Sequence, residues 1–186
     1  LALPKGIVTF VGIIACIAFL VEGAIMDWGG VFLTTVRHFD MSLAGTAFTV
    51  FSAAMLTMRL FGDWTVQKLG QERIVIGGSL LAVAGFLLVI FAAEPALLYL
   101  GFFAIGIGCA NVVPVFFSLL GKQRVMPISL AVPAVSTLGY LGILMGPAVI
   151  GFIAHQTSLY TAFGLLAFLV LLQSIIAAYV YRHILD

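Results

Sequence analysis

The stretch GIVTFVGIIACIAFLVEGAIMDWGGVFLTT, residues 6–35, is apolar, small or aromatic at almost every position and carries two charged side chains, Glu22 and Asp27. A helix needs about 20 predominantly apolar residues to cross the roughly 30 Å hydrocarbon core of a bilayer. This stretch is longer than that, so it predicts a transmembrane helix that holds two carboxylates at membrane depth.

The composition of the whole chain agrees with a membrane protein. Of its 186 residues, 63% are hydrophobic and 8% are charged, and the mean hydropathy is +1.27. An average soluble domain has about 25% charged residues, which it needs to cover its surface with polar side chains. We therefore expect this chain to be embedded in a bilayer.

Further apolar runs of similar length divide the chain into six predicted spans, joined by short connections that hold most breakers and charges. Continuous runs of this kind exclude the alternating pattern of β-barrel strands. The sequence thus predicts an all-α membrane protein with a single six-helix domain over residues 1–186. The predicted spans are 6–35, 43–66, 74–92, 95–120, 127–155 and 159–181.

The basic residues lie almost entirely on one side of this predicted topology. Arg37 alone falls on the other side. Basic residues accumulate in cytoplasmic loops, so both termini are predicted to be cytoplasmic, with the protein in the inner membrane of a bacterium. The residues that define the basic side are Lys5, Lys68, Arg73, Lys122, Arg124 and Arg182, together with Arg59 near the end of the second span.

The two carboxylates of the first span are expected to act separately. Glu22 lies near the middle of the span, and Asp27 lies about 7–8 Å further out and about 140° around the helix. A carboxylate at the bilayer centre is costly, so Glu22 should face the bundle interior or a watery cavity. Glu22 is a candidate for proton coupling or substrate binding, with a structural hydrogen bond as the alternative. Asp27 fits an outer gate or a plain interfacial anchor.

The fourth and fifth spans contain helix-disturbing residues. Pro114 leaves the carbonyl of Ala110 without a helical donor, and Asn111 places an amide near mid-membrane, for ligand binding or for packing. With Phe116, Asn111 is a candidate cavity residue. The fifth span holds small residues that permit close helix packing or a moving interface around a softened helix: Gly139, Gly142, Gly146, Pro147 and Gly151.

Arg59 and Asp63 lie four residues apart near the end of the second span, which places them on one face of a continuous helix. Asp63 would then lie at the helix C-terminus, where the dipole disfavours an anion. It should need a partner, such as Arg59, Lys68, Arg73 or the N-terminal end of a neighbouring helix. The alternative is a solvated ion pair of little energetic value.

The segment RLFGDWTVQKLGQER, residues 59–73, resembles the loop signature that follows the second helix of each six-helix half in the major facilitator superfamily. It implies a gating loop containing Arg59, Gly62, Asp63, Gly70 and Arg73. The family pattern has Gly where this chain has Arg59, a basic residue at Trp64 and Gly at Val66. The six spans and the glycine-rich fifth span are similar to the C-terminal half of such a transporter.

This resemblance implies a 3+3 inverted repeat in which helices one and four line a central cavity, helices two and five contact the other half, and helices three and six lie outside. It implies a secondary active transporter that moves a small solute by alternating access, with possible proton coupling through Glu22. The expected partners are a missing N-terminal half on the same polypeptide, lipid, a small-molecule substrate and protons. The chain is accordingly expected to be a piece of a longer protein.

Other activities find less support in the sequence. No cofactor or metal site is expected, because there is no phosphate-binding loop and Cys16 and Cys109 lie in apolar runs without further ligands. No basic stripe indicates nucleic-acid binding. An intramembrane protease would need Ser136 to meet one of three histidines that lie at span ends. A non-transporting membrane subunit or receptor on the same bundle remains the alternative function.

Overall fold

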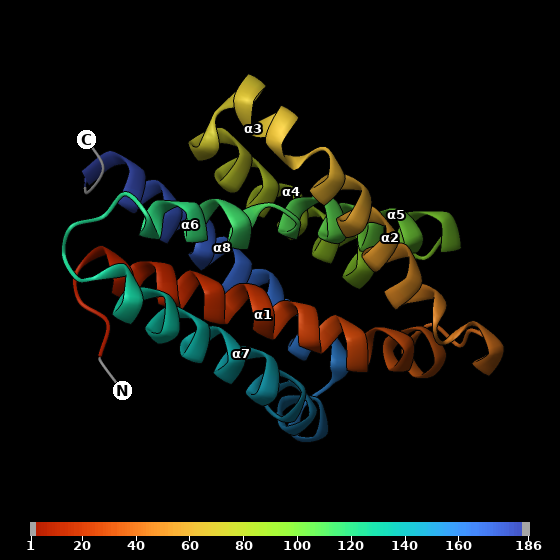
Figure 1. The fold of residues 1–186 in the computed structure, drawn as a ribbon. Coiled ribbons are helices and arrows are strands. Elements are labelled where there is room, and N and C mark those ends of the chain that lie inside the picture. The colour runs from red at the N-terminus through yellow and green to blue at the C-terminus, as the bar shows by residue number, and fades with distance from the viewer. Residues whose placement is uncertain (1–2, 184–186) are drawn as a thin grey trace.

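The computed structural model describes residues 3–183, which form a bundle of six membrane-length helical segments. Figure 1 shows the start of α1, the end of α8, α3 and the α6–α7 connection at one end of the bundle, here named the terminal end; the opposite end is the far end. The α-helices are α1 (Ile7–Val31), α2 (Thr46–Leu60), α3 (Gly62–Leu69), α4 (Gln71–Phe91), α5 (Pro95–Cys109), α6 (Val112–Leu120), α7 (Ile128–Gln156) and α8 (Leu159–His183).

Two predicted spans are broken in the structure. The expected helix over 43–66 ends at Leu60, and a second helix begins at Gly62 after a turn at Phe61. The expected helix over 95–120 is interrupted at Ala110 and Asn111. Pro114 accounts for this second break, because it has no N–H to donate to the carbonyl of Ala110.

The packing of the spans follows an internal two-fold pattern. α1 packs against α7, and α2 packs against α5; α4 packs against α5 and α8, and α8 also packs against α1. Exchanging the first three spans with the last three turns α1–α7 into α2–α5 and α4–α5 into α1–α8, and it leaves the α4–α8 pair unchanged. This exchange is the contact pattern of a 3+3 inverted repeat.

The glycines of α7 lie against α1 within this bundle. A Cβ atom at Gly142 would collide with the backbone carbonyl of Cys16, and one at Gly146 would lie 2.8 Å from the carbonyl oxygen of Leu20. Gly139 faces Phe19 in the same way, and Gly151 accommodates the indole of Trp28. These four glycines therefore permit close packing between α1 and α7.

A second close crossing, between α4 and α5, was not predicted from the sequence. Gly78 and Gly85 of α4 meet Gly108 and Gly101 of α5, and a Cβ atom at Gly85 would lie 2.7 Å from the carbonyl oxygen of Gly101. Within each helix the two glycines are seven residues apart, so both lie on one face. These glycines let the two helix backbones touch.

Arg37 joins three helices at the far end. Its Nη2 donates to the carbonyl oxygens of Val89 at 2.9 Å and Ile90 at 2.7 Å, in the last turn of α4. Its guanidinium also lies 5.7 Å and 5.6 Å from the ring centroids of Phe32 and Tyr160. A cation is favourable at a helix C-terminus, where carbonyls lack helical donors. Arg37 thus caps α4 and holds the ends of α1 and α8 beside it.

Candidate functional site

The charged centre of the bundle consists of Glu22 and Arg59. Nη2 of Arg59 lies 3.8 Å from Oε2 of Glu22, and the two side chains are 41% and 31% exposed, in that order. Glu22 is near the middle of the first span, which runs over Ile7–Val36. Arg59 thus does not belong with the loop cations, and the basic residues of the loops divide six to one.

The break in the fourth span provides a second partner for Arg59, a hydrogen-bond acceptor. Its Nε donates to the carbonyl oxygen of Ala110 at 3.2 Å. This carbonyl is the one that Pro114 leaves without a helical donor. Arg59 therefore bridges the carboxylate of the first span and the broken backbone of the fourth span.

Asn111 occupies the same break and lies directly against the break in the second span. The residue is 6% exposed, and its Nδ2 has no hydrogen-bond partner among the described residues. A Cβ atom at Gly62 would lie 2.7 Å from its Oδ1. The two helix breaks are thus stacked on each other, and Gly62 leaves the space that the Asn111 side chain fills.

Replacing Gly62 by alanine should push these two breaks apart. Because Asn111 is buried, its side chain must turn away from the added methyl group and toward the hollows that it lines, and we expect Gly62→Ala to lower the free energy of unfolding by about 1 kcal/mol. The measurement is thermal unfolding of the purified full-length protein. Gly77→Ala is the matched control, since nothing lies within 4 Å of a Cβ atom at Gly77. Equal stability of the two variants would contradict the stacking of the breaks.

A polar cavity of about 290 Å³ lies beside the charged centre, between α2–α3 and α6. Its polar groups come from four elements, so the fold and not the sequence brings them together. The lining residues are Arg59, Gly62, Asp63, Val66, Gln71, Asn111, Pro114, Val115 and Ser118. This cavity is named the polar cavity below.

Asp63 lies in the first turn of α3, not at the end of a continuous helix. The dipole there favours a carboxylate, so the predicted unfavourable position was wrong; the turn at Phe61 is the reason. Within residues 3–183, Asp63 has no ion-pair partner at 4.0 Å or less. The Lys68 ammonium lies 4.2 Å from the centroid of the Trp64 ring instead.

The other predicted loop residues lie on the connection between α3 and α4. Gly70 has φ +84°, a conformation that suits glycine, and it separates the two helices. Arg73 follows in the first turns of α4 and lines a hollow of about 210 Å³ with Gly78 and Asn111. Neither residue lines the polar cavity.

Asp27 is separated from the charged centre, as predicted. It is exposed and lines a hollow of about 400 Å³ between the far ends of α1 and α2. The adjacent Trp28 points toward α7 instead, because its Nε1 donates to the carbonyl oxygen of Pro147 at 3.0 Å. This hydrogen bond fixes α1 to α7 beside the proline of α7.

Phe116 is not a cavity residue, contrary to the expectation from sequence. Its side chain is fully buried in the hydrophobic core near the terminal end, and its ring centroid lies 6.1 Å from that of Tyr181. It lies five residues after Asn111, so it faces another side of the span. Its position therefore indicates packing.

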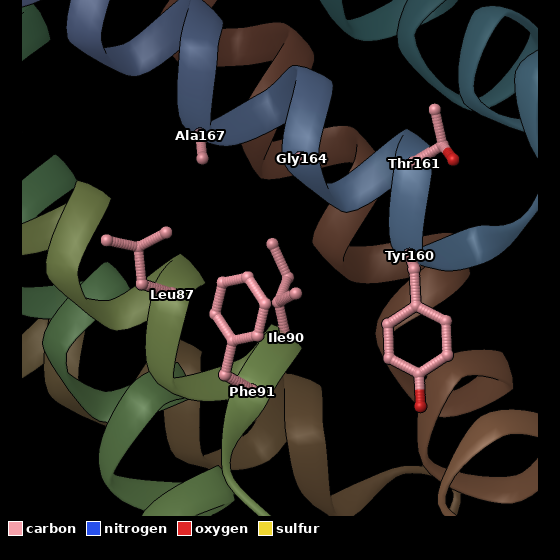
Figure 2. Close-up of a pocket in the computed structure, with 7 residues that line it drawn as sticks. All are labelled: Leu87, Ile90, Phe91, Tyr160, Thr161, Gly164 and Ala167. Carbon is pink, nitrogen blue, oxygen red and sulfur yellow. The ribbon is translucent and has the colours of Figure 1, made fainter.

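An apolar cavity of about 460 Å³ lies between the far ends of α4 and α8. Figure 2 shows Leu87, Ile90 and Phe91 of α4 on one side and Gly164 and Ala167 of α8 on the other. Its polar groups are the hydroxyls of Tyr160 and Thr161. No charged side chain lines it, so this cavity is a poor candidate for moving an ion.

α7 has large apolar side chains that the bundle leaves exposed, although the ring of one of them, Tyr140, stacks on Phe19 of α1 with the ring centroids 6.3 Å apart. Tyr140, Leu141, Leu144, Met145 and Phe152 are exposed there. α2 also has a mostly exposed surface, including Leu56 and Leu60. The second and fifth spans are therefore the least covered of the six.

The family model described as Major Facilitator Superfamily matches residues 11–184, almost the whole chain. The chain belongs to the major facilitator superfamily. The stacked breaks, the packing pattern and the Glu22–Arg59 centre are thus features of a major facilitator chain. The six membrane-length helices make it an integral membrane protein.

Two transporters are similar to this chain in sequence. An uncharacterized MFS-type transporter of Yersinia pestis is 45% identical over 168 residues, which are 90% of this chain and 44% of the relative. An uncharacterized transporter of Sinorhizobium fredii is 32% identical over 177 residues, or 95% of this chain and 47% of the relative. The chain spans about half the length of the curated relatives it matches.

Solved structures show the same fold. The POT family transporter PepTSo matches with a TM-score of 0.77 at 20% identity, covering 98% of this chain and 38% of that chain. A peptide transporter POT in complex with sulfate matches with a TM-score of 0.79 at 18% identity, covering 97% and 40%. At this level of identity, the likeness concerns the fold alone.

Proposed function

We propose that this chain is the C-terminal half of a secondary active transporter that moves a small solute by alternating access. The observation that carries the proposal is the ion pair between Glu22, near the middle of α1, and Arg59, just before the break in the second span, in a major facilitator bundle. Charged groups at this depth typically mark a substrate or ion pathway. Six helices of this fold need a second half to enclose a pathway with two entrances.

The uncovered faces support a missing partner half. α2 and α7 expose large apolar side chains, and the glycines that would permit close packing are already used inside the bundle. We propose that the N-terminal half, on the same polypeptide, packs against these two helices. Lipid then covers the outer surface of α4 and α8.

The charge distribution supports an orientation. At the terminal end, α3 contains Lys68 and the α6–α7 connection contains Lys122 and Arg124, while Arg37 is at the far end. By the positive-inside rule, the terminal end faces the cytoplasm and both termini are cytoplasmic. We propose the bacterial inner membrane as the location, because the relatives come from bacteria.

Within this arrangement each candidate residue has a separate role. Glu22 is the proton-coupling or substrate-binding carboxylate, and Asn111 offers an unpartnered amide to the polar cavity beside it. Asp63 belongs to the cytoplasmic gate, where its free carboxylate can receive a group from the other half. Asp27 lies at the external mouth.

The proposal is tested with the full-length protein in proteoliposomes. We expect saturable uptake or exchange of at least one solute from a panel of sugars, organic acids, amino compounds and drugs, and uptake that responds to an imposed proton gradient. The absence of uptake, together with no ligand-dependent shift of the thermal unfolding midpoint, would instead identify a non-transporting membrane subunit or receptor.

A further inference from the structure

We infer that the Arg59 side chain is a movable link between two carboxylates: it pairs with Glu22 when Glu22 is charged and with Asp63 when Glu22 is neutral. The charge of the central carboxylate would then control access to the polar cavity. The inference rests on the proposed role of Glu22 as the coupling carboxylate. It assigns a function to a residue at which this chain departs from the family signature, where a glycine is usual. Three observations carry it.

First, the contact with Glu22 is loose. The Arg59–Glu22 distance of 3.8 Å is longer than a charge-assisted hydrogen bond, and the Arg59 side chain is 41% exposed. Its firmest contact is the Nε hydrogen bond to the carbonyl of Ala110. The guanidinium is therefore held at Nε, and its two terminal nitrogens are free to change partner.

Second, the alternative partner, Asp63, lines the same cavity as Arg59 and has no ion-pair partner among the described residues. Arg59 and Asp63 are four residues apart in sequence and both line the polar cavity. Among the described residues, the Asp63 carboxylate accepts no hydrogen bond from another side chain and forms no ion pair. Turning from Glu22 toward the cavity brings the guanidinium to Asp63.

Third, few other charged side chains compete for pairing with Arg59, Glu22 or Asp63. The ionisable groups that face Glu22 from neighbouring helices are Arg59 of α2 and the buried thiol of Cys109 in α5. The other charged side chains on α3 and at the start of α4 are Lys68, Glu72 and Arg73, and Lys68 lies over Trp64. Loss of the negative charge on Glu22 thus leaves Asp63 as the stronger attraction for Arg59.

The expected consequence is a change in access to the polar cavity. When Glu22 is charged, Arg59 stays at the centre and the cavity is open. When Glu22 is neutral, the guanidinium enters the cavity, pairs with Asp63 and fills the space beside Ser118. Coupling energies between sites in proteins typically change an equilibrium by about 5-fold or more, which is within reach of a labelling experiment.

The test uses a cysteine at Ser118, which is exposed and lines the cavity. In the full-length protein, with Cys16 and Cys109 replaced by alanine, the rate of maleimide labelling of Ser118→Cys is measured in permeabilised membranes. We expect Glu22→Gln to slow labelling by about 5-fold or more. The decrease should vanish when Arg59→Gln or Asp63→Asn is added, and persist with Arg59→Lys.

Controls separate the link from general effects. A cysteine at Ser129, exposed at the terminal end of α7, should label at one rate in all variants, and size-exclusion chromatography checks that each variant is folded. Slow labelling that persists without Arg59 or without Asp63, or an unchanged rate in Glu22→Gln, would overturn the inference. Labelling requires no substrate, so the labelling result can be interpreted whether or not transport of a solute is detected.

Discussion

Gly142→Leu is expected to prevent the first and fifth spans from packing, and hence to abolish accumulation of folded protein. Even a Cβ atom at Gly142 would collide with the backbone carbonyl of Cys16. Backbone cannot move aside as a flexible side chain does, so the cost lies at or above the upper end of the usual overpacking range of about 1–3 kcal/mol. Fluorescence-detected size-exclusion chromatography of the full-length protein in detergent measures the folded fraction.

Gly164→Leu is the matched control for this change. Gly164 is also inside a membrane-length helix, but nothing lies within 4 Å of a Cβ atom there, and it borders the apolar cavity shown in Figure 2. The same side chain therefore fits at one glycine and not at the other. Similar yields of monodisperse protein from both variants would refute the assignment of Gly142 to close packing.

Glu22→Gln is expected to remove gradient-driven accumulation of the solute while exchange of solute across the membrane continues. A carboxylate can bind and release a proton at mid-membrane, and an amide cannot. A proton gradient of one pH unit supplies about 1.4 kcal/mol, which sustains about a tenfold concentration ratio for each coupled proton. The variant should lose this ratio and reach only equal concentrations.

The comparison variant is Asp27→Asn, which neutralises the exposed carboxylate at the far end of the same helix. It should retain the gradient-driven concentration ratio. The measurement is accumulation and counterflow of one solute in proteoliposomes with an imposed pH difference. Full accumulation by Glu22→Gln, or an equal loss in both variants, would show that Glu22 is not the coupling group.

Much of the fold follows from local pattern. The apolar runs predicted all six spans, because bilayer thickness sets a minimum helix length that needs no knowledge of neighbours. The resemblance of residues 59–73 to the family signature also led to the correct family. The separation of Glu22 and Asp27 followed from helix geometry alone.

The partners of the candidate residues did not follow from the sequence. Periodicity placed Arg59 with Asp63, but the turn at Phe61 breaks that helix and Arg59 meets Glu22 and Ala110 instead. Phe116 was grouped with Asn111 because both lie in the fourth span, yet only Asn111 borders the polar cavity. Glycine spacing showed that α7 packs closely with something, and the fold identified this neighbour as α1.

The amino-acid pattern was enough to predict that this chain spans a membrane six times and that Glu22 lies near the middle of the first span. Both depend on the number and kind of residues along one helix. Which charges meet and which glycines touch became known only from the packing of the helices, because those contacts join residues 16 to 126 positions apart. Such contacts depend on how broken helices are stacked, and no single helix encodes that arrangement.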